Sequence, residues 1–270
     1  MKKIPKTYIF IALILIAYVI GIFFFKKGEK EKDHNVVYVL AGINTRLLYQ
    51  DQEWHTMASQ TEEYKWKEFK LYNSGVYEGT YKIQNQLGVD SYYDNDYVPI
   101  GKMDVGYMAI SSPGKFDYVG TSDLTINKED ANLMQVMQEN NITNFDSILN
   151  SKIIVTDLNS DEEDDKLYYI SNLFTGSEDQ YFSIVFAVID GKIQYIKKHI
   201  NREVNHDDDV EQYVSIPDSY LNGVLKIGNN QYPKIFIENS YYGRAETCFE
   251  IYEYKKRKFE NIRKCEEDET

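Results

Sequence analysis

The strongest candidate for chemistry is an acidic stretch, "DLNSDEEDD", which runs from Asp157 to Asp165. It places six carboxylates within nine residues, and the apolar segments "KIIV" and "KLYYI" stand on either side of it. Carboxylates this close repel one another, and a bound cation would turn that repulsion into attraction. Side-chain oxygens of Asp and Asn are ligands that Ca²⁺ prefers, at about 2.3–2.6 Å. The stretch therefore predicts a Ca²⁺ loop.

Alternate positions of this loop supply the candidate ligands. Counted from its first residue, oxygen-bearing side chains fall at every odd position from 1 to 9: Asp157, Asn159, Asp161, Glu163 and Asp165. An EF-hand is excluded, because its sixth position requires Gly and its twelfth a bidentate Glu, where this chain has Glu162 and Tyr168. The competing interpretation is an ordinary solvated turn, since Asp and Asn readily adopt turn conformations.

The pattern strand, D-x-[DN]-x-D-x-x-x-D, strand resembles the calcium loop of the FG-GAP and VCBS repeats, which occur in integrin-like β-propellers and many bacterial surface proteins. The resemblance implies Ca²⁺ coordination by the side chains of Asp157, Asn159, Asp161 and Asp165, with a backbone carbonyl at Glu163. The chain departs from the family at positions 4 and 6, where the family prefers Gly and this chain has Ser160 and Glu162. The resemblance lies mostly within residues 150–262.

A weak duplication accompanies the loop. The segment 166–196 aligns with the segment 234–262 at an offset of 66 to 68 residues, and each has an apolar strand, a Gly and a Phe-x-Ile strand in the same order. Repeated strand–loop–strand units predict a propeller-like or sandwich architecture. The second copy has only "KIGNNQYPKIFI" before its strand, so its ligand set is lost and the copy is degenerate.

Composition also favours a mainly β fold. The chain has 24 Tyr and 13 Phe but only 5 Pro, and flat or β-branched side chains fit a pleated sheet. Strand patterns occur at 36–42, 46–50, 66–72, 75–83 and 104–111, separated by turn residues. One helix is expected near 128–140, capped by Asn127, with a face formed by Leu133, Met134, Val136 and Met137. We divide the body into a β-rich region with the helix, 36–150, and a second β-rich region, 151–270.

The N-terminus predicts a membrane anchor. An uncharged run, Thr7 to Phe25, lies between lysines, and its 19 residues would form a helix of about 28 Å, close to the thickness of a bilayer core. The run is too long for a signal peptide and lacks a small-x-small cleavage site, so we expect residues 1–25 to remain as a tail and a single transmembrane helix. Residues 26–35 form a charged stalk. The positive-inside rule puts the short Lys-rich tail in the cytoplasm and the body outside the cell membrane.

Charge and cysteine content fit that location. Residues 1–32 hold seven of the 30 basic side chains and only two of the 43 acidic ones, so the rest of the chain is strongly acidic. Such a body disfavours nucleic-acid binding. The two cysteines, Cys248 and Cys265, either pair in a disulfide, as extracytoplasmic proteins often do, or are separate free thiols.

The hypotheses about function rest partly on the catalytic motifs that the sequence lacks. It has no H-E-x-x-H, G-x-S-x-G or phosphate-binding Gly motif, and its four histidines are scattered. A membrane-anchored extracytoplasmic module that binds or scaffolds an unidentified protein or carbohydrate is the first hypothesis, and "DSYYDNDY" (90–97) is its candidate contact loop. A cell-surface hydrolase with paired carboxylates and a single-span subunit of a membrane assembly are the alternatives. "NHDDDVEQY" (205–213) is a weaker cation candidate.

Overall fold

The protein is described here by a computed structural model. It defines the following residues: 36–41, 45–51, 53–56, 67–73, 75–82, 107–120, 126–172, 181–201, 217–228, 232–241 and 247–265. Within these ranges the chain is mainly β with one α-helix, as the composition predicted. The predicted membrane anchor and stalk lie outside them. No helix in the described part of the chain is long and apolar enough to cross a membrane.

The first sheet, named sheet A, contains the five strands that the sequence predicted between residues 36 and 111, and one further strand, β3, that it did not predict. Its antiparallel strands have the spatial order β3-β2-β1-β6-β4-β5. They are β1 (Val37–Ala41), β2 (Thr45–Gln50), β3 (Glu53–Thr56), β4 (Glu68–Asn73), β5 (Val76–Lys82) and β6 (Tyr107–Ser111). Neighbouring residues of a strand point to opposite faces, and both Val39 and Leu40 of β1 are buried. Sheet A is therefore covered on both faces at β1.

The rest of the chain forms two four-stranded meanders. The first meander has the order β11-β10-β9-β8, and the second has the order β15-β14-β13-β12 with β7 (Phe116–Val119) added beside β12. The strands of the first are β8 (Asn150–Thr156), β9 (Asp165–Ser171), β10 (Tyr181–Ile189) and β11 (Lys192–Asn201). Those of the second are β12 (Pro217–Ile227), β13 (Lys234–Tyr241), β14 (Thr247–Lys255) and β15 (Lys258–Arg263).

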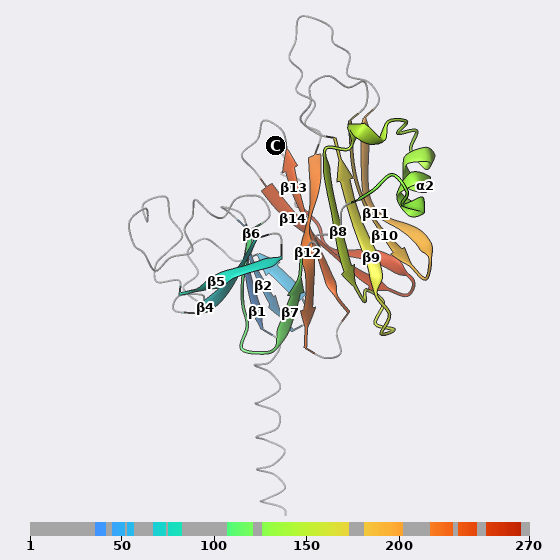
Figure 1. Ribbon diagram of the computed structural model, residues 1–270. Coiled ribbons are helices and arrows are strands. Elements are labelled where there is room, and N and C mark those ends of the chain that lie inside the picture. The colour runs from blue at the N-terminus through green and yellow to red at the C-terminus, as the bar shows by residue number, and fades with distance from the viewer. Residues whose placement is uncertain are drawn as a thin grey trace, which may run out of the picture.

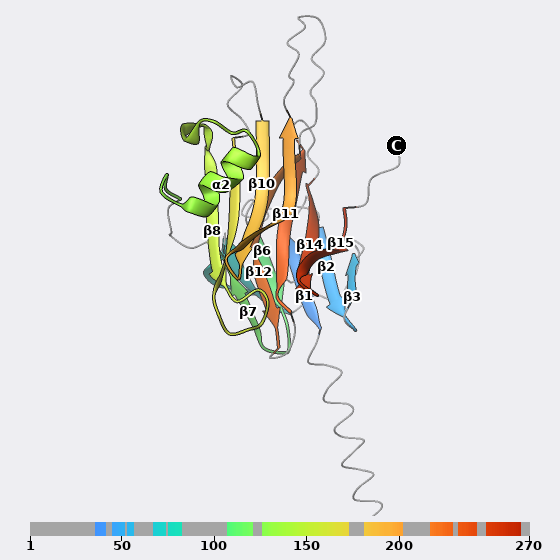
Figure 2. The ribbon, with the colours of Figure 1, turned by 90° about the vertical axis from the view of Figure 1, so that its right-hand side faces the viewer.

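The sheets are stacked, with the second meander in the middle (Figures 1 and 2). One face of the second meander packs on the first meander, where Leu167 and Val185 meet Ile235 and Ile237. Its other face packs on sheet A through a separate cluster of buried side chains: Val39, Leu47, Ile110, Leu225, Phe236 and Ile251, among others. The described sheets remain open and do not close into a propeller.

The helix α2 (Ala131–Glu139) covers the outer face of the first meander (Figure 1). It is shorter than predicted, and its cap is Asp130, whose Oδ1 accepts the backbone N–H groups of Asn132 and Leu133 at 3.0 and 3.1 Å. Asn127 instead accepts the N–H of Glu129 at 2.7 Å, within the preceding turn. Both residues are good caps, and the prediction chose the one a turn too early.

The apolar face of α2 also differs from the prediction. Leu133, Val136 and Met137 are buried against the first meander, as expected. Met134 lies at the edge of this stripe and is 44% exposed. A short 3₁₀ helix, Phe145–Ser147, follows α2.

Two tyrosines of the first meander fix the ends of α2. Tyr168 donates to Asp130 at 2.9 Å, and Tyr195 donates to Glu139 at 2.6 Å. Burial and the hydrogen bond to a carboxylate raise the pKa of Tyr195 to about 12. Because both hydroxyls stay protonated at ordinary pH, each can serve as a permanent donor to the helix.

Candidate functional site

The acidic stretch forms the connection between β8 and β9. The ladder of this hairpin ends at the pair Thr156 and Asp165, so the loop closes on the last predicted ligand. Asp157 organises the turn: its Oδ1 accepts the N–H groups of Ser160 at 2.6 Å and Asp161 at 3.2 Å, and its Oδ2 accepts that of Glu162 at 3.2 Å. One carboxylate thus holds three successive amides.

The next predicted ligands contact one another. Asn159 donates from Nδ2 to Oδ2 of Asp161 at 2.7 Å. The other carboxylate oxygen of Asp161 accepts the backbone N–H of Glu163 at 2.9 Å, and the Glu163 side chain is exposed. The middle of the loop is therefore held by short-range hydrogen bonds between its own residues.

Asp165 is the buried member of the set, at 6% exposure. Its Oδ2 accepts the N–H of Leu158 at 2.9 Å, which anchors the loop to the core. Burial raises the pKa of Asp165, and the negative charges of Asp161 and Asp157 raise it further, against the lowering effect of the backbone hydrogen bonds. The charges of Asp161 and Asp157 therefore disfavour the ionised form of Asp165.

The backbone of the loop is left-handed at two non-glycine residues. Ser160 has φ of 64° and Glu162 has φ of 72°. These are positions 4 and 6 of the loop, where FG-GAP and VCBS repeats prefer Gly. A left-handed conformation costs an ordinary residue about 1–2 kcal/mol, so the loop holds this conformation without the residue that adopts it most easily.

The loop carboxylates do not converge on one point. Among the residues that the structure describes, no group of three or more His, Cys, Asp or Glu side chains has the arrangement of a metal site. The candidate ligands share a loop, but their oxygens are directed to amides and to each other. Coordination of a cation would require the bond between Asn159 and Asp161 to be exchanged for metal contacts.

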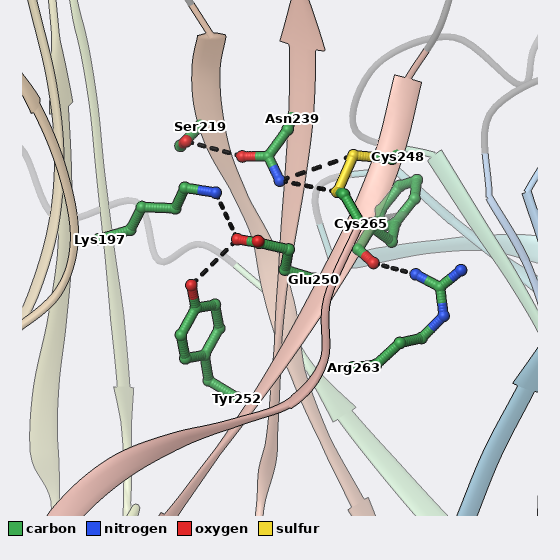
Figure 3. The surroundings of a disulfide bond; sticks show 9 residues. Lys197, Ser219, Asn239, Cys248, Glu250, Tyr252, Arg263 and Cys265 are labelled. Atoms are coloured by element: carbon green, nitrogen blue, oxygen red, sulfur yellow. Dashed lines mark hydrogen bonds and ion pairs between the residues drawn. A yellow bond between two sulfur atoms is a disulfide. The ribbon is translucent and has the colours of Figure 1, made fainter. Parts of the chain in front are cut away.

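Cys248 and Cys265 are joined in a disulfide, with their Cα atoms 5.7 Å apart. The bond connects the beginning of β14 to the chain just after β15 (Figure 3). The guanidinium of Arg263 donates to the backbone carbonyl of Phe249 beside it. The last described segment is thus attached to the second meander by a covalent and a polar link.

A buried polar cluster lies next to this disulfide, between the two meanders (Figure 3). Lys197 of β11 forms an ion pair with Glu250 of β14, and their side chains are only 15% and 12% exposed. Tyr252 donates to the same carboxylate at 3.0 Å. Although burial alone would raise it, the pKa of Glu250 is lowered by the hydrogen bond and charge of Lys197.

His199 lies two residues beyond Lys197 on β11. Its Nε2 is buried and has no hydrogen-bond partner among the described residues. Burial lowers the pKa of His199, the charge of Lys197 lowers it further, and Glu250 opposes the shift. The imidazole is therefore biased towards its neutral form.

A second buried ion pair lies within the second meander, and its lysine also lies over the ring of Tyr49 in sheet A. Lys234 and Glu253 are directly paired across β13 and β14, and each side chain is only 4% exposed. The other oxygen of Glu253 contacts Lys255, which is partly exposed. Burial lowers the pKa of Lys234, against the raising effect of Glu253.

Sequence reasoning missed these clusters for a physical reason. In "CFEIYEYK" the apolar Phe249 and Ile251 alternate with Glu250, a pattern that predicts one buried and one solvated face. Both faces of β14 are in fact covered, one by the first meander and one by sheet A. The polar clusters could have been found only with knowledge of which sheets stack on each other.

Two weaker candidates, 90–97 and 205–213, lie outside the described residues. Comparison with known proteins gives no further guide: no family model, no curated protein and no solved structure matches this chain. The chemistry of the described residues is therefore the basis for a functional proposal.

Proposed function

We propose that this protein is a membrane-anchored extracytoplasmic binding or scaffolding module, in which the loop between β8 and β9 takes a structural Ca²⁺ ion. The observation that carries the proposal is the backbone of this loop. It curls around Asp157, which holds three amides, and it is left-handed at Ser160 and Glu162. This is the curvature that the glycines of an FG-GAP or VCBS calcium loop would be expected to provide.

The donor set is chemically suited to Ca²⁺. Carboxylate, amide and carbonyl oxygens are the ligands of this hard cation. The side chains of Asp157, Asn159, Asp161 and Asp165 and the carbonyl of Glu163 would hold it. The pKa of Asp165 is raised first by burial and then by its acidic neighbours, so its negative charge is disfavoured in the loop. A bound cation would neutralise that charge.

The disulfide supports the extracytoplasmic location. Disulfides persist in oxidising compartments and are rare in the cytosol. An anchor at residues 7–25, with the tail inside, would deliver the body to that side of the membrane. The stacked sheets suit a sandwich-type scaffold rather than a propeller, and its partner would be a protein or a carbohydrate.

The hydrolase alternative receives no support from the buried carboxylates that the structure describes on β14. Glu250 and Glu253 are each held by a lysine rather than by a second carboxyl group. Paired carboxyl groups across a cleft are what acid-base hydrolysis of this kind requires. We therefore retain the binding module.

Thermal unfolding of the detergent-solubilised full chain tests the calcium site. A ligand that binds only the folded state stabilises it by about 2.7 kcal/mol when its free concentration is about 100 times its dissociation constant. We expect Ca²⁺, but not Mg²⁺, to raise Tm relative to EDTA, and Asp157→Asn and Asp161→Asn to abolish the rise. Asp190→Asn, in the exposed turn between β10 and β11, should retain it. An equal Tm in Ca²⁺ and EDTA for the unmodified chain would contradict the calcium proposal.

Protease treatment of intact cells tests the location independently. We expect the body to be digested while a tag on the N-terminal tail is protected. A protected body would overturn the orientation and leave the calcium result unaffected.

A further inference from the structure

The interior between the two meanders changes from apolar to polar towards the disulfide. Leu167 and Ile235 are completely buried in the apolar part. Near the disulfide the interior contains Ser219 and Asn239 instead, which are 0% and 1% exposed. Buried polar groups are stable only when they have partners, so the contacts of this region decide what it can do.

Glu250 lies between an amine and an amide. Its carboxylate pairs with the ammonium group of Lys197, and the side-chain amide of Asn239 also donates to it. Figure 3 shows the three side chains converging from β11, β13 and β14. Lys197 belongs to the first meander and Glu250 to the second, so their ion pair crosses between two sheets.

The amide of Asn239 has a polarised carbonyl. Its Oδ1 accepts a hydrogen bond from the hydroxyl of Ser219 at 2.7 Å. Its Nδ2 faces Sγ of Cys265 at 3.3 Å, and sulfur is a weak acceptor. The oxygen is thus held by a good donor, and the nitrogen has a comparatively weak partner on the side of the disulfide.

We propose that Lys197 and Asn239 are joined in the mature protein by an intramolecular isopeptide bond, formed with Glu250 as the proton carrier and Ser219 as the donor to the oxyanion. A nucleophile, an electrophile, a general base and an oxyanion donor are the groups that such an acyl transfer needs. The cluster supplies one of each.

The reaction balances without any further reactant. Lys197 passes a proton to Glu250, and its neutral amine attacks Cγ of Asn239. The oxyanion on Oδ1 is stabilised by Ser219, and Glu250 transfers a proton from the attacking to the leaving nitrogen. The Cγ–Nδ2 bond breaks, so an ammonium side chain and a primary amide become a secondary amide and ammonium.

The fold favours this slow, single-turnover step. The four groups are held on four strands of a packed core, and fixed proximity can replace high effective concentrations of the reacting groups. Burial also excludes the water that would compete for the amide carbon. The product would tie the first meander to the second, at the end where the disulfide already closes the second.

Intact mass spectrometry of the purified full chain, denatured and reduced, tests the bond. We expect the mass to be lower than the sequence mass by one ammonia, and digestion to yield a branched peptide that contains both Lys197 and Asn239. Lys197→Arg and Asn239→Ala should restore the full mass. Lys198→Arg is the matched control, because Lys198 points away from the cluster and donates to Asn140, so it should keep the loss.

The outcome is decisive even if the variants fail to fold, because the unmodified chain alone gives the answer. A full sequence mass, or an ammonia loss that maps to a cyclised asparagine with no branched peptide, would overturn the proposal and leave Lys197 and Glu250 as an ion pair only. Neither result bears on the calcium loop.

Discussion

The two meanders are built alike. In each, the hairpin between the last two strands has a two-residue left-handed turn, formed by Asp190 and Gly191 in the first and by Lys256 and Arg257 in the second. The ladder of each hairpin shifts register at the corresponding place, after Val185 in the first and after Ile251 in the second. The two features share an offset of 66 residues, which lies within the range that the sequence alignment gave.

The meanders differ in what surrounds them. The first has the acidic loop between its opening strands and α2 on its outer face, whereas the second has a short connection and sheet A. At the same offset, Lys197 and His199 correspond to Arg263 and Cys265. Equivalent backbone positions therefore carry a lysine in an ion pair and an imidazole in one copy, and an arginine and a disulfide-bonded cysteine in the other. The repeated backbone is the scaffold, and the specific chemistry lies in substitutions on it.

The largest difference in stability that we expect between the meanders comes from the lysine near the start of the second strand of each, β13 and β9. Lys234 begins β13 in a buried ion pair, while its counterpart Lys166 on β9 is exposed. Removing one partner of a buried pair costs about 3–5 kcal/mol, because the other charge stays buried. We expect Lys234→Met to lower the free energy of unfolding by about 3 kcal/mol, at the low end of that range because Lys255 still contacts Glu253.

The matched variant Lys166→Met should change the same quantity by less than about 0.5 kcal/mol, as surface substitutions usually do. Urea unfolding followed by tryptophan fluorescence measures both. Equal effects of the two variants would contradict the expected difference, in which Lys234 is buried in an ion pair and Lys166 is exposed.

The sequence predicted the scaffold better than the chemistry. β1, β2, β4 and β6 were recognised because aromatic and β-branched residues alternate between turn signals, and the correspondence of the meanders was visible in the spacing of Gly and Phe-x-Ile. The acidic loop was located correctly between two strands. Its side-chain directions were not predictable, because they depend on which backbone amides the turn brings to Asp157.

The interior polar groups could not be predicted for a different reason. A charged residue that alternates with apolar ones indicates solvent on one face of a strand, and Glu250 and Glu253 contradict this only because a third sheet is stacked on the second meander. The helix cap shows a smaller failure of the same kind, since Asn127 and Asp130 both cap turns and only the position of α2 on the first meander selects between them.

The hairpin turns of the two meanders allow reciprocal substitutions, and we expect their effect on stability to be intermediate in size. Arg257 has φ of 65°, a conformation that its counterpart Gly191, with φ of 68°, adopts without cost. A Cβ at Gly191 would meet no atom within 4 Å, so only the backbone conformation matters there. We expect Arg257→Gly to stabilise and Gly191→Arg to destabilise the protein, each by roughly 1 kcal/mol. Calorimetric Tm values measure both, and shifts of the same sign would refute the equivalence of the turns.

The smallest effect that we expect is the pH dependence that His199 gives to the contact between the meanders. Burial and then Lys197 lower its pKa in the folded protein, so its neutral form is favoured there. The charged groups that act on it are Lys197 on its own strand and Glu250 on β14, and of these only Glu250 carries a compensating charge. A depressed folded-state pKa means that stability is complete above the unfolded value of about 6.5 and falls as the pH drops below it, until the folded-state pKa is passed.

His199→Gln keeps the polar shape without the titration. It should flatten the dependence of the urea midpoint on pH between pH 7 and pH 5, while His55→Gln, on exposed β3, should leave that slope as it is. A midpoint for the unmodified chain that rises as the pH falls would mean that His199 gains a partner on protonation, and that this end of the stack is held by charge rather than by burial.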